Sequence, residues 1–445
     1  MAEPHKTAAV IGAGWAGCSA AVELAGAGYQ VTLFEAARTL GGRARAVEIN
    51  GQLLDNGQHI LLGAYAETLR LLKLTGVARD AALLTLPLQM RYPAGGSGMD
   101  FVAPRLPAPL HLAIALLRAK GLARADKMAL ARFSTTARWM DWRLHTDCSV
   151  SELLERFDQT PRLTALMWRP LCLAALNTPP ERASAQIFLN VLRDSLGARR
   201  SSSDMLLPKT DLTSLFPQAA ARYLEARGGA VRLGAKVQAV RPQGDGWQLE
   251  TAADDAGIHA DAVIFAGGAP ASAALLRPLG QAALADQLDA FAYEPIATCY
   301  LQYPPDTRLD LPFYALVDEP AQGHWGQFVF DRGQLDPAQA GLLAVVISAS
   351  SAAGELGREA LAAAIAAQLA EVLARPALAT PVWTQVITEK RATYACAPGL
   401  ARPPVQTTLP GLAIAGDYTA GDYPATLEAA VRSGVAAARA VRRPA

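Results

Sequence analysis

Three glycines near the N-terminus have the spacing of a phosphate-binding loop. They form the pattern G-x-G-x-x-G in the segment Gly12-Ala13-Gly14-Trp15-Ala16-Gly17, directly after the apolar run Thr7 to Ile11. Gly12 permits a tight turn, Gly14 lets a pyrophosphate approach the backbone, and Gly17 lets the following helix pack on the strand. The free N–H groups at the start of that helix favour an anion. We therefore predict a dinucleotide site at Gly12, Gly14, Trp15, Ala16 and Gly17.

An acidic residue follows at the distance that this kind of site requires. Glu35 lies 18 residues beyond Gly17, at the end of a second apolar run from Val31 to Phe34. A carboxylate at this place accepts hydrogen bonds from the ribose hydroxyls of an adenosine and repels the 2′-phosphate of NADP. The pattern therefore leaves FAD or NAD as the cofactor.

A second glycine pair distinguishes FAD from NAD. Gly41, Gly42, Arg43 and Ala44 resemble the G-G-R-x motif that follows the ribose-binding acid in flavin amine oxidases and carotenoid desaturases. The glycines allow close backbone approach, and the arginine can pair with phosphate charge. The resemblance implies that these four residues contact FAD.

The C-terminal segment resembles the other flavin motif of the same superfamily. Gly416 and Asp417 end a predicted strand, and a helix is expected to begin near Ala425, Thr426 and Leu427. Asp417 would accept a hydrogen bond from the ribityl chain, and the positive end of the helix would face the flavin ring. Val237 either holds the adenine through its backbone, as in the superfamily, or belongs to the core of a sheet.

A closer resemblance rests on four blocks of sequence: 43–45, 54–65, 168–178 and 423–428. Together they resemble the bacterial hydroxysqualene dehydroxylase family, within the flavin amine oxidase and phytoene desaturase superfamily. That resemblance implies transfer of hydride from reduced FAD to an allylic carbon of hydroxysqualene, giving squalene and water in hopanoid and squalene biosynthesis. It also implies upstream squalene-pathway synthases as partners. A phytoene-type desaturase, an amine oxidase and a non-catalytic prenyl-lipid escort protein are the alternatives.

Such a reaction needs an acid that protonates the departing hydroxyl. His59 is the first candidate because an imidazole titrates in the useful range, although hydrogen bonds to backbone or flavin could simply fix its ring. Asp55 is the second candidate, or a buried carboxyl that orients its loop. Trp168, Arg169 and Asn177 could contact substrate or could serve helix packing and a cap.

The elements that position these residues predict an α/β fold. We expect a Rossmann-like FAD-binding domain of the GR2 flavoprotein type, formed by residues 1–78, 212–285 and 395–445. Residues 79–211 and 286–394 would form an inserted α+β substrate domain with a helical subdomain. Predicted helices cover 110–118, 123–142, 150–157, 183–196, 357–373 and 426–441, and strand patterns include 231–240, 247–251, 262–266, 298–303, 326–330, 343–348 and 412–415.

Composition restricts the partners. Lys plus Arg is 41 against 40 for Asp plus Glu, which gives no broad field for nucleic acid. Five scattered cysteines without a C-x-x-C pair predict neither a disulfide framework nor a metal site.

The start of the sequence carries no recognisable leader, so we expect a cytoplasmic enzyme. The apolar run Leu106 to Leu117 is too short to cross a bilayer. Its basic flanks suit either a helix on the inner membrane surface or an ordinary core helix.

Overall fold

A five-stranded parallel sheet forms the centre of one part of the molecule. The computed structural model describes residues 6–94, 98–252 and 254–442, with residues 254–256 described by backbone only. The strand order is β10-β2-β1-β14-β20, and all four pairings are parallel. The strands are β1 (Thr7–Ile11), β2 (Gln30–Glu35), β10 (Ala230–Leu233), β14 (Ala262–Phe265) and β20 (Leu412–Ile414). The order reverses between β1 and β14, which is where Rossmann folds bind ligand.

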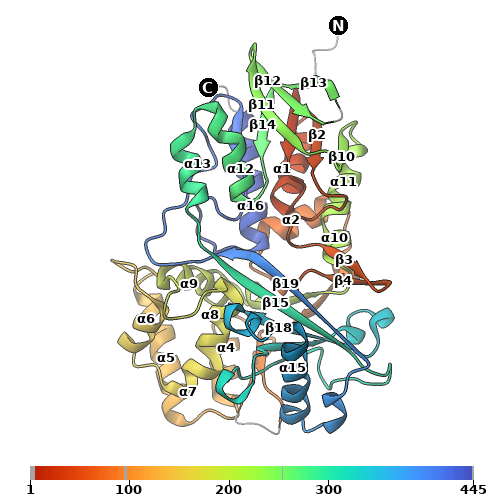
Figure 1. Ribbon diagram of the computed structural model, residues 1–445. Helices are drawn as coiled ribbons and strands as arrows, with labels where there is room; N and C mark the ends of the chain where they lie inside the picture. The colour runs from red at the N-terminus through yellow and green to blue at the C-terminus, as the bar shows by residue number, and fades with distance from the viewer. Residues whose placement is uncertain (1–5, 95–97, 253, 443–445) are drawn as a thin grey trace.

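Two helices from opposite ends of the chain lie side by side against this sheet (Figure 1). They are α1 (Trp15–Gly26) and α16 (Leu427–Arg442). A Cβ atom on Gly434 would lie 2.1 Å from the backbone oxygen of Ala16, so the two helices touch through a bare backbone surface. The Ser19 hydroxyl also contacts the Val431 carbonyl at 3.1 Å. Helices α2 (Ala66–Leu74), α10 (Leu212–Leu215), α11 (Pro217–Glu225), α12 (Ala269–Leu276) and α13 (Ala282–Asp289) complete this part.

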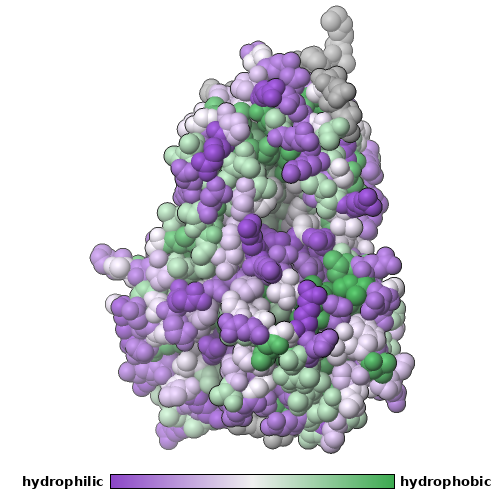
Figure 2. Space-filling view, in the orientation of Figure 1, coloured by the Kyte–Doolittle hydropathy of each residue, from purple (hydrophilic) through white to green (hydrophobic). Residues whose placement is uncertain are grey.

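A second five-stranded sheet is antiparallel and lies below the first in Figure 1. Its order is β16-β17-β18-β15-β19. The strands are β15 (Tyr293–Gln302), β16 (Phe313–Ala315), β17 (Phe328–Asp331), β18 (Leu342–Ser348) and β19 (Trp383–Tyr394), and helix α15 (Arg358–Val372) packs on them. Figure 2 shows the surface hollowed between the parts that contain the two sheets, with hydrophilic side chains along the lower rim.

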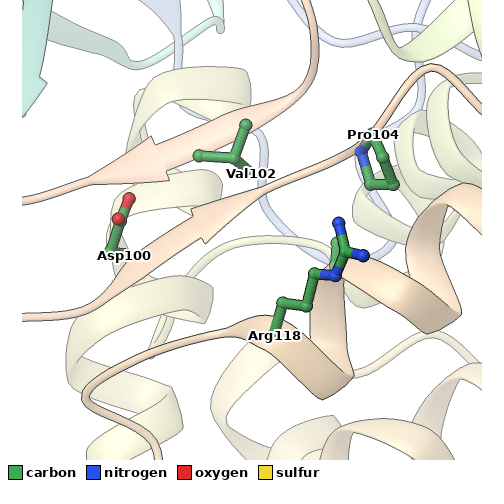
Figure 3. Close-up of a pocket in the computed structure, with 5 residues that line it drawn as sticks. Asp100, Val102, Pro104 and Arg118 are labelled. Carbon is green, nitrogen blue, oxygen red and sulfur yellow. The ribbon is translucent and has the colours of Figure 1, made fainter.

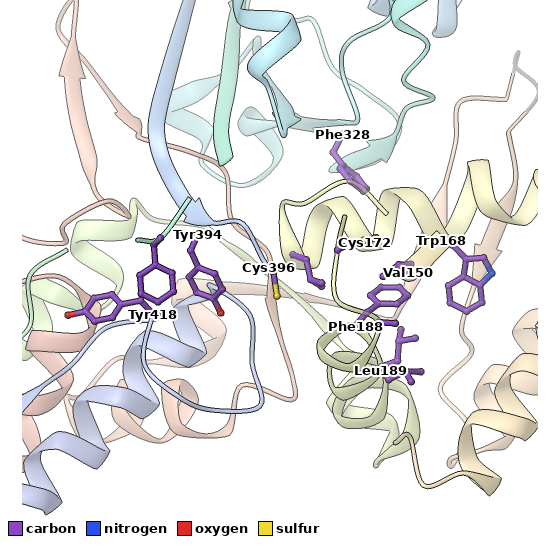
Figure 4. Close-up of a cluster of buried hydrophobic side chains, with 14 of the residues drawn as sticks. Val150, Trp168, Cys172, Phe188, Leu189, Phe328, Tyr394, Cys396 and Tyr418 are labelled. Carbon is purple, nitrogen blue, oxygen red and sulfur yellow. The ribbon is translucent and has the colours of Figure 1, made fainter. Parts of the chain in front are cut away.

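Helices beside the second sheet enclose an apolar cluster. They are α4 (Leu110–Arg118), α5 (Arg124–Trp139), α6 (Val150–Arg156), α7 (Pro161–Leu163), α8 (Arg169–Leu176) and α9 (Ala185–Leu192). Trp168, whose ring lies 4.5 Å from that of Phe133, belongs to this cluster with Phe188 (Figure 4). All five cysteines are buried and free. None of the helices in the described ranges is long and apolar enough to span a membrane.

The structure confirms the predicted fold class and corrects several elements. The single strand expected at 231–240 is two strands in different sheets, because Gly234 turns the chain with φ +65°. The second of them, β11 (Val237–Gln243), pairs with β12 (Gly246–Thr251), which pairs with β13 (Asp254–Ala260). The predicted helical insertion also contains β6 (Leu83–Leu86), β7 (Gln89–Arg91), β8 (Asp100–Val102) and β9 (Met205–Pro208). The second half of the helix expected at 183–196 is a wider π-type turn, Arg193–Gly197.

The division into domains stays a proposal. The parallel sheet uses strands from residues 7–35, 230–265 and 412–414, all within the segments that we assign to the FAD-binding domain. Residues 1–5, on which the expected absence of a leader partly depends, and residues 443–445 lie outside the described ranges.

Candidate active site

Two glycine loops meet at the reversal point of the parallel sheet. The N–H of Gly41 donates to the carbonyl of Ala13 at 2.9 Å, and a Cβ atom on Gly42 would lie 3.1 Å from Gly14 Cα. Gly42 also has φ +62°, a conformation that other residues rarely adopt. The two predicted motifs thus form one surface of bare backbone. Helix α1 begins there without a side-chain cap, which leaves its N-terminal N–H groups available to a phosphate.

The side chains of the first helical turn point away from this surface. Trp15 packs on Phe216 with ring centroids 5.2 Å apart, and its Nε1 donates to the Ala44 carbonyl at 3.2 Å. Ala16 is buried against α16. Any cofactor contact of Trp15, Ala16 or Ala44 is therefore a backbone contact.

Glu35 and Val237 lie at the adenosine end of the predicted site. One Glu35 carboxylate oxygen accepts the N–H of Ala13 and the other accepts the N–H of Ala37, each at 2.8 Å. The Glu35 carbonyl accepts the N–H of Ala235 at 2.9 Å, which holds the start of β11 beside the end of β2. Val237 is the buried first residue of β11. The roles of Glu35 and Val237 in adenosine binding stay predictions.

We expect Glu35→Ala to weaken FAD binding by 10-fold to 100-fold, because it removes charge-assisted hydrogen bonds worth roughly 1.5 to 3 kcal/mol each. Titration of apoprotein with FAD, followed by flavin fluorescence, measures the change. Glu48→Ala, at an exposed position on β3 (Ala46–Ile49), is the matched control and should bind FAD normally. Equal affinities for the two variants would show that Glu35 does not contact the cofactor.

Arg43 and Asp417 form an ion pair across the site. Nη2 of Arg43 lies 2.6 Å from Oδ1 of Asp417, and Nη1 donates to the Ala392 carbonyl at 2.7 Å. Burial lowers the pKa of Arg43, but the Asp417 carboxylate more than offsets this and the net direction is upward. The Arg43 side chain is 39% exposed although its partner Asp417 is buried, so it lines a space that a ligand can enter, referred to below as the internal space. Sequence alone assigned the two residues to separate parts of FAD and did not predict their pairing.

The C-terminal motif supports the helix that follows it. The Thr426 hydroxyl accepts the N–H of Ala429 at 3.2 Å, so this side chain caps α16. Ala425, Thr426 and Leu427 are half-buried, and Gly416 is held by its N–H bond to Ser433 Oγ at 2.9 Å. The backbone at the start of α16 is therefore the part that can face a flavin.

The neighbouring Glu428 was missed by sequence reasoning. Its fully buried carboxylate accepts the N–H groups of Glu67 and Thr68 at the start of α2, and Arg432 pairs with it at 2.7 Å. Glu428 thus fixes the position of α16.

His59 is partly exposed and lies close enough to Arg43 to be affected by its charge. Its Nδ1 is 3.1 Å from the Gly57 carbonyl, which can only accept, so the proton of the neutral ring is on Nδ1. Burial and the Arg43 charge lower the pKa of His59, although the Gly57 hydrogen bond opposes them. The ring is therefore mostly neutral at pH 7, with Nε2 as the nitrogen that can face a ligand. It acts as an acid only in its protonated form.

Asp55 is buried and tied to another segment. Its Oδ1 accepts the N–H of Leu212 at 2.8 Å. Burial raises the pKa of the Asp55 carboxyl to about 7, although the Leu212 hydrogen bond and the Arg332 charge act in the opposite direction. This geometry matches the alternative in which Asp55 orients its loop, while the raised pKa keeps a proton available.

The pH dependence of unfolding of an Asp55→Asn variant tests whether the pKa of Asp55 is raised in the folded protein. The folded-state pKa of about 7 is above the unfolded value of 3.8, so the folded chain binds the extra proton and wild-type stability falls between pH 4 and pH 7. The variant keeps an acceptor for Leu212 but does not titrate. We expect the free energy of unfolding of the variant, relative to that of the wild type, to increase by up to about 4 kcal/mol from pH 4 to pH 7 and to stay constant above pH 7. Denaturant unfolding at several pH values measures the difference; exposed Asp306→Asn is the control. A pH-independent difference would contradict the raised pKa.

A buried polar network supports the His59 segment, and sequence reasoning did not find it. Arg332 donates to Gln58 Oε1 at 3.0 Å, Gln58 donates to the Tyr300 hydroxyl at 2.8 Å, and Tyr300 donates to the Asp55 carbonyl at 2.8 Å. These residues are far apart in the sequence. The network holds the segment just before His59 against β15 and against the turn that follows β17.

Three further candidates from the helical region make contacts within the protein. Trp168 is buried, and its Nε1 donates to Gln159 at 2.9 Å. Asn177 ends α8 in a left-handed conformation; its amide donates to Thr393 at 3.0 Å and accepts from the N–H of Ala349 at 2.7 Å. Arg169 pairs with Asp318 at 3.0 Å. These contacts favour packing and capping over substrate contact.

The arrangement fits FAD. The bare surface of Gly14 and Gly42 suits a pyrophosphate, an acid lies at the end of β2, and a cation with a carboxylate partner lines an internal space beside His59. Two helix N-termini from opposite ends of the chain complete these surroundings. The fold and the site define an FAD-dependent oxidoreductase.

Comparison with known proteins gives the family. Residues 15–442 match the model of the family described as flavin containing amine oxidoreductase, and the chain belongs to this family. Hydroxysqualene dehydroxylase of Rhodopseudomonas palustris is 29% identical over 97% of both chains. Zeta-carotene desaturase of Synechocystis is 24% identical, covering 97% of this chain and 96% of the relative. Among solved structures, an oxidoreductase from Methanosarcina mazei has a TM-score of 0.70 at 18% identity, covering 96% of this chain and 98% of that one.

Proposed function

We propose that this enzyme converts hydroxysqualene to squalene. The observation that carries the proposal is full-length similarity, at 26 to 29% identity, to three relatives named hydroxysqualene dehydroxylase. The internal space beside Arg43 and His59 supports it, because the reaction needs an enclosed site with a proton donor. The substrate is a long isoprenoid alcohol, and squalene-pathway synthases upstream would supply it.

The chemistry divides between cofactor and protein. Reduced FAD, when bound, would supply the hydride for the new C–H bond, and the hydroxyl would leave as water. His59 Nε2 gives the proton to the departing oxygen, while Gly57 holds Nδ1 and so aims the ring. Arg43 and Asp417 hold the cofactor end of the space, and the Gln58 network keeps the His59 loop in place.

Asp55 is the second candidate for the acid because burial raises its pKa to about 7. One oxygen of its carboxylate accepts the N–H of Leu212, which favours a positioning role. The pH dependence of turnover, considered below, separates the two residues.

Anaerobic mixing of dithionite-reduced protein with hydroxysqualene tests the proposed reaction. We expect one squalene per flavin, with reoxidation of the flavin at the same rate. Phytoene mixed with oxidised protein should leave the flavin oxidised. Reduction of the flavin by phytoene would instead show a desaturase, and reduction by a primary amine would show an amine oxidase.

The escort alternative predicts a protein that binds isoprenoids without flavin. A purified protein without flavin absorption bands, indifferent to added FAD, would support it and contradict our proposal.

The residues before α16 argue against an amine oxidase. Pro424 and Ala425 stand where an aromatic cage around an amine would need bulky side chains.

We also propose a cytoplasmic enzyme that works peripherally on the inner face of the membrane. The support is the short apolar segment Leu106 to Leu117 with its basic flanks. A thirty-carbon substrate and product would then exchange with lipid rather than with water.

A further inference from the structure

Large apolar side chains are exposed on two neighbouring helices, α4 and α5. Leu110 and Leu117 of α4 are 55% and 70% exposed, and Met128 and Trp139 of α5 are 53% and 87% exposed. The opposite faces of these helices are buried in the apolar cluster. Tryptophan rarely lies this far out of a folded chain without a partner, so the exposed face needs an explanation.

The two helices follow each other in the chain, and one interaction at each end places them near one another. Lys127 Nζ near the start of α5 donates to the Leu117 carbonyl at the end of α4, at 2.8 Å. At the other end, the pKa of His111 is lowered first by burial, then by the charge of Arg200 and then by that of Arg138, so Arg138 of α5 is close enough to the start of α4 to act on His111. We refer to Leu110, Leu117, Met128 and Trp139 as the α4–α5 face. Both helices lie in the lower left of Figure 1.

The charge around this face differs from that of the whole chain. Residues 105–143 contain eight Lys or Arg and two Asp or Glu, against 41 and 40 in the full sequence. One of the two acids, Asp126, is buried and bonded to the Ala123 N–H and the Thr160 hydroxyl. Arg118, Lys120, Arg124, Arg132 and Arg138 are exposed. The apolar face therefore has a cationic rim.

We propose that the α4–α5 face docks on the surface of an anionic lipid bilayer. Apolar side chains flanked by cations are the pattern of helices that lie in the headgroup region of a membrane. A second copy of this chain would place the same cations against each other, which like-charge repulsion opposes. Neither helix is long enough to span, so the docking is peripheral.

A pocket lies beside this face, between α4 and the strand β8. A pocket of about 270 Å³ is lined by Val102 and Pro104 on one side and Ala115 and Arg118 of α4 on the other, with Asp100 at its end (Figure 3). Asp204 acts electrostatically on His111 of α4, and its carbonyl accepts the N–H of Gly63, four residues beyond His59.

Vesicle flotation tests the proposal on the holoenzyme. We expect binding to vesicles of phosphatidylcholine with 30% phosphatidylglycerol and none to phosphatidylcholine alone. Leu117→Ser combined with Trp139→Ser should weaken binding at least tenfold. Arg132→Gln combined with Arg138→Gln should also weaken binding at least tenfold, because each cation near the surface is attracted to the anionic lipids. Val382→Ser is the matched control. Val382 directly precedes β19, is 70% exposed, and lies far from the α4–α5 face in the sequence.

The outcomes are decisive without any knowledge of the substrate. Unchanged flotation of the Leu117 and Trp139 variant, or equal binding to neutral vesicles, would overturn the proposal. The proposal would also fail if the wild type did not float and sedimented as a dimer that dissociates in this variant. Tighter binding of the wild type to a single-stranded oligonucleotide than to vesicles would overturn it as well. Flavin absorbance and the unfolding midpoint should stay as in the wild type, which excludes misfolding. Flotation does not depend on turnover, so its failure differs from failure of the proposed reaction.

Discussion

Gly17→Ala is expected to give a protein that folds poorly and loses its flavin. A Cβ atom at this position would lie 1.8 Å from the Gly12 carbonyl oxygen and 3.1 Å from Ala266 Cβ. The clash is with backbone, so helix α1 would have to move away from β1. Gly12 cannot easily shift instead, because a Cβ atom built on it would lie only 2.8 Å from the Ala266 backbone, which shows how tightly Gly12 is packed. Overpacking of this kind costs about 3 kcal/mol or more. The same movement would separate the α1 N-terminus from the phosphate site.

Denaturant unfolding and the ratio of flavin to protein absorbance measure the effect. Gly354→Ala is the matched control, because nothing lies within 4 Å of its added Cβ and its backbone is unstrained. That variant should be yellow and as stable as the wild type. A yellow Gly17→Ala protein with a wild-type midpoint would show that α1 does not need to approach β1 so closely.

His59→Gln is expected to lower the rate of squalene formation by about 10² to 10⁴, the usual contribution of a general acid. FAD should remain bound, because Gly41, Gly42 and Arg43 are unchanged. The pH dependence identifies the acid more firmly than the rate. The pKa of His59 is lowered below 6.5, so wild-type kcat should fall as pH rises through a value in the acidic range. This limb should be absent in the variant.

The Asp55 alternative gives a different profile. If Asp55 is the acid, kcat falls as pH rises through about 7, and Asp55→Asn rather than His59→Gln removes the limb. Exposed His145→Gln is the control for a general effect of losing a histidine and should leave the rate unchanged. A profile of His59→Gln identical to that of the wild type would exclude His59 as the proton donor.

The parts of the site that could be predicted are local in sequence. The loop from Gly12 to Gly17 and Glu35 at the end of β2 follow from short-range spacing, because strand, turn and helix are adjacent in the chain. Their surroundings in the structure agree with that pattern. The binding roles of these residues await the measurements above.

The remaining contacts depend on tertiary packing. Arg43 and Asp417 are 374 residues apart, and Glu428 reaches Thr68 across 360 residues. No periodicity or composition encodes such pairs. Strand β19 was missed for a related reason: its exposed face carries Thr384, Lys390 and Arg391, so it lacks an apolar run, and it is held by pairing with β15.

The close crossing of α1 and α16 has a consequence for how the enzyme is made. The first helix of the chain and the last one pack together at Gly434, and the last strand, β20, closes one edge of the parallel sheet. A nascent chain in which β20 and α16 have not yet left the ribosome therefore lacks one side of the flavin site, however well its N-terminal half has folded. FAD can be fully enclosed only after α16 has packed on α1, and a chain that stops before α16 carries no complete place for it.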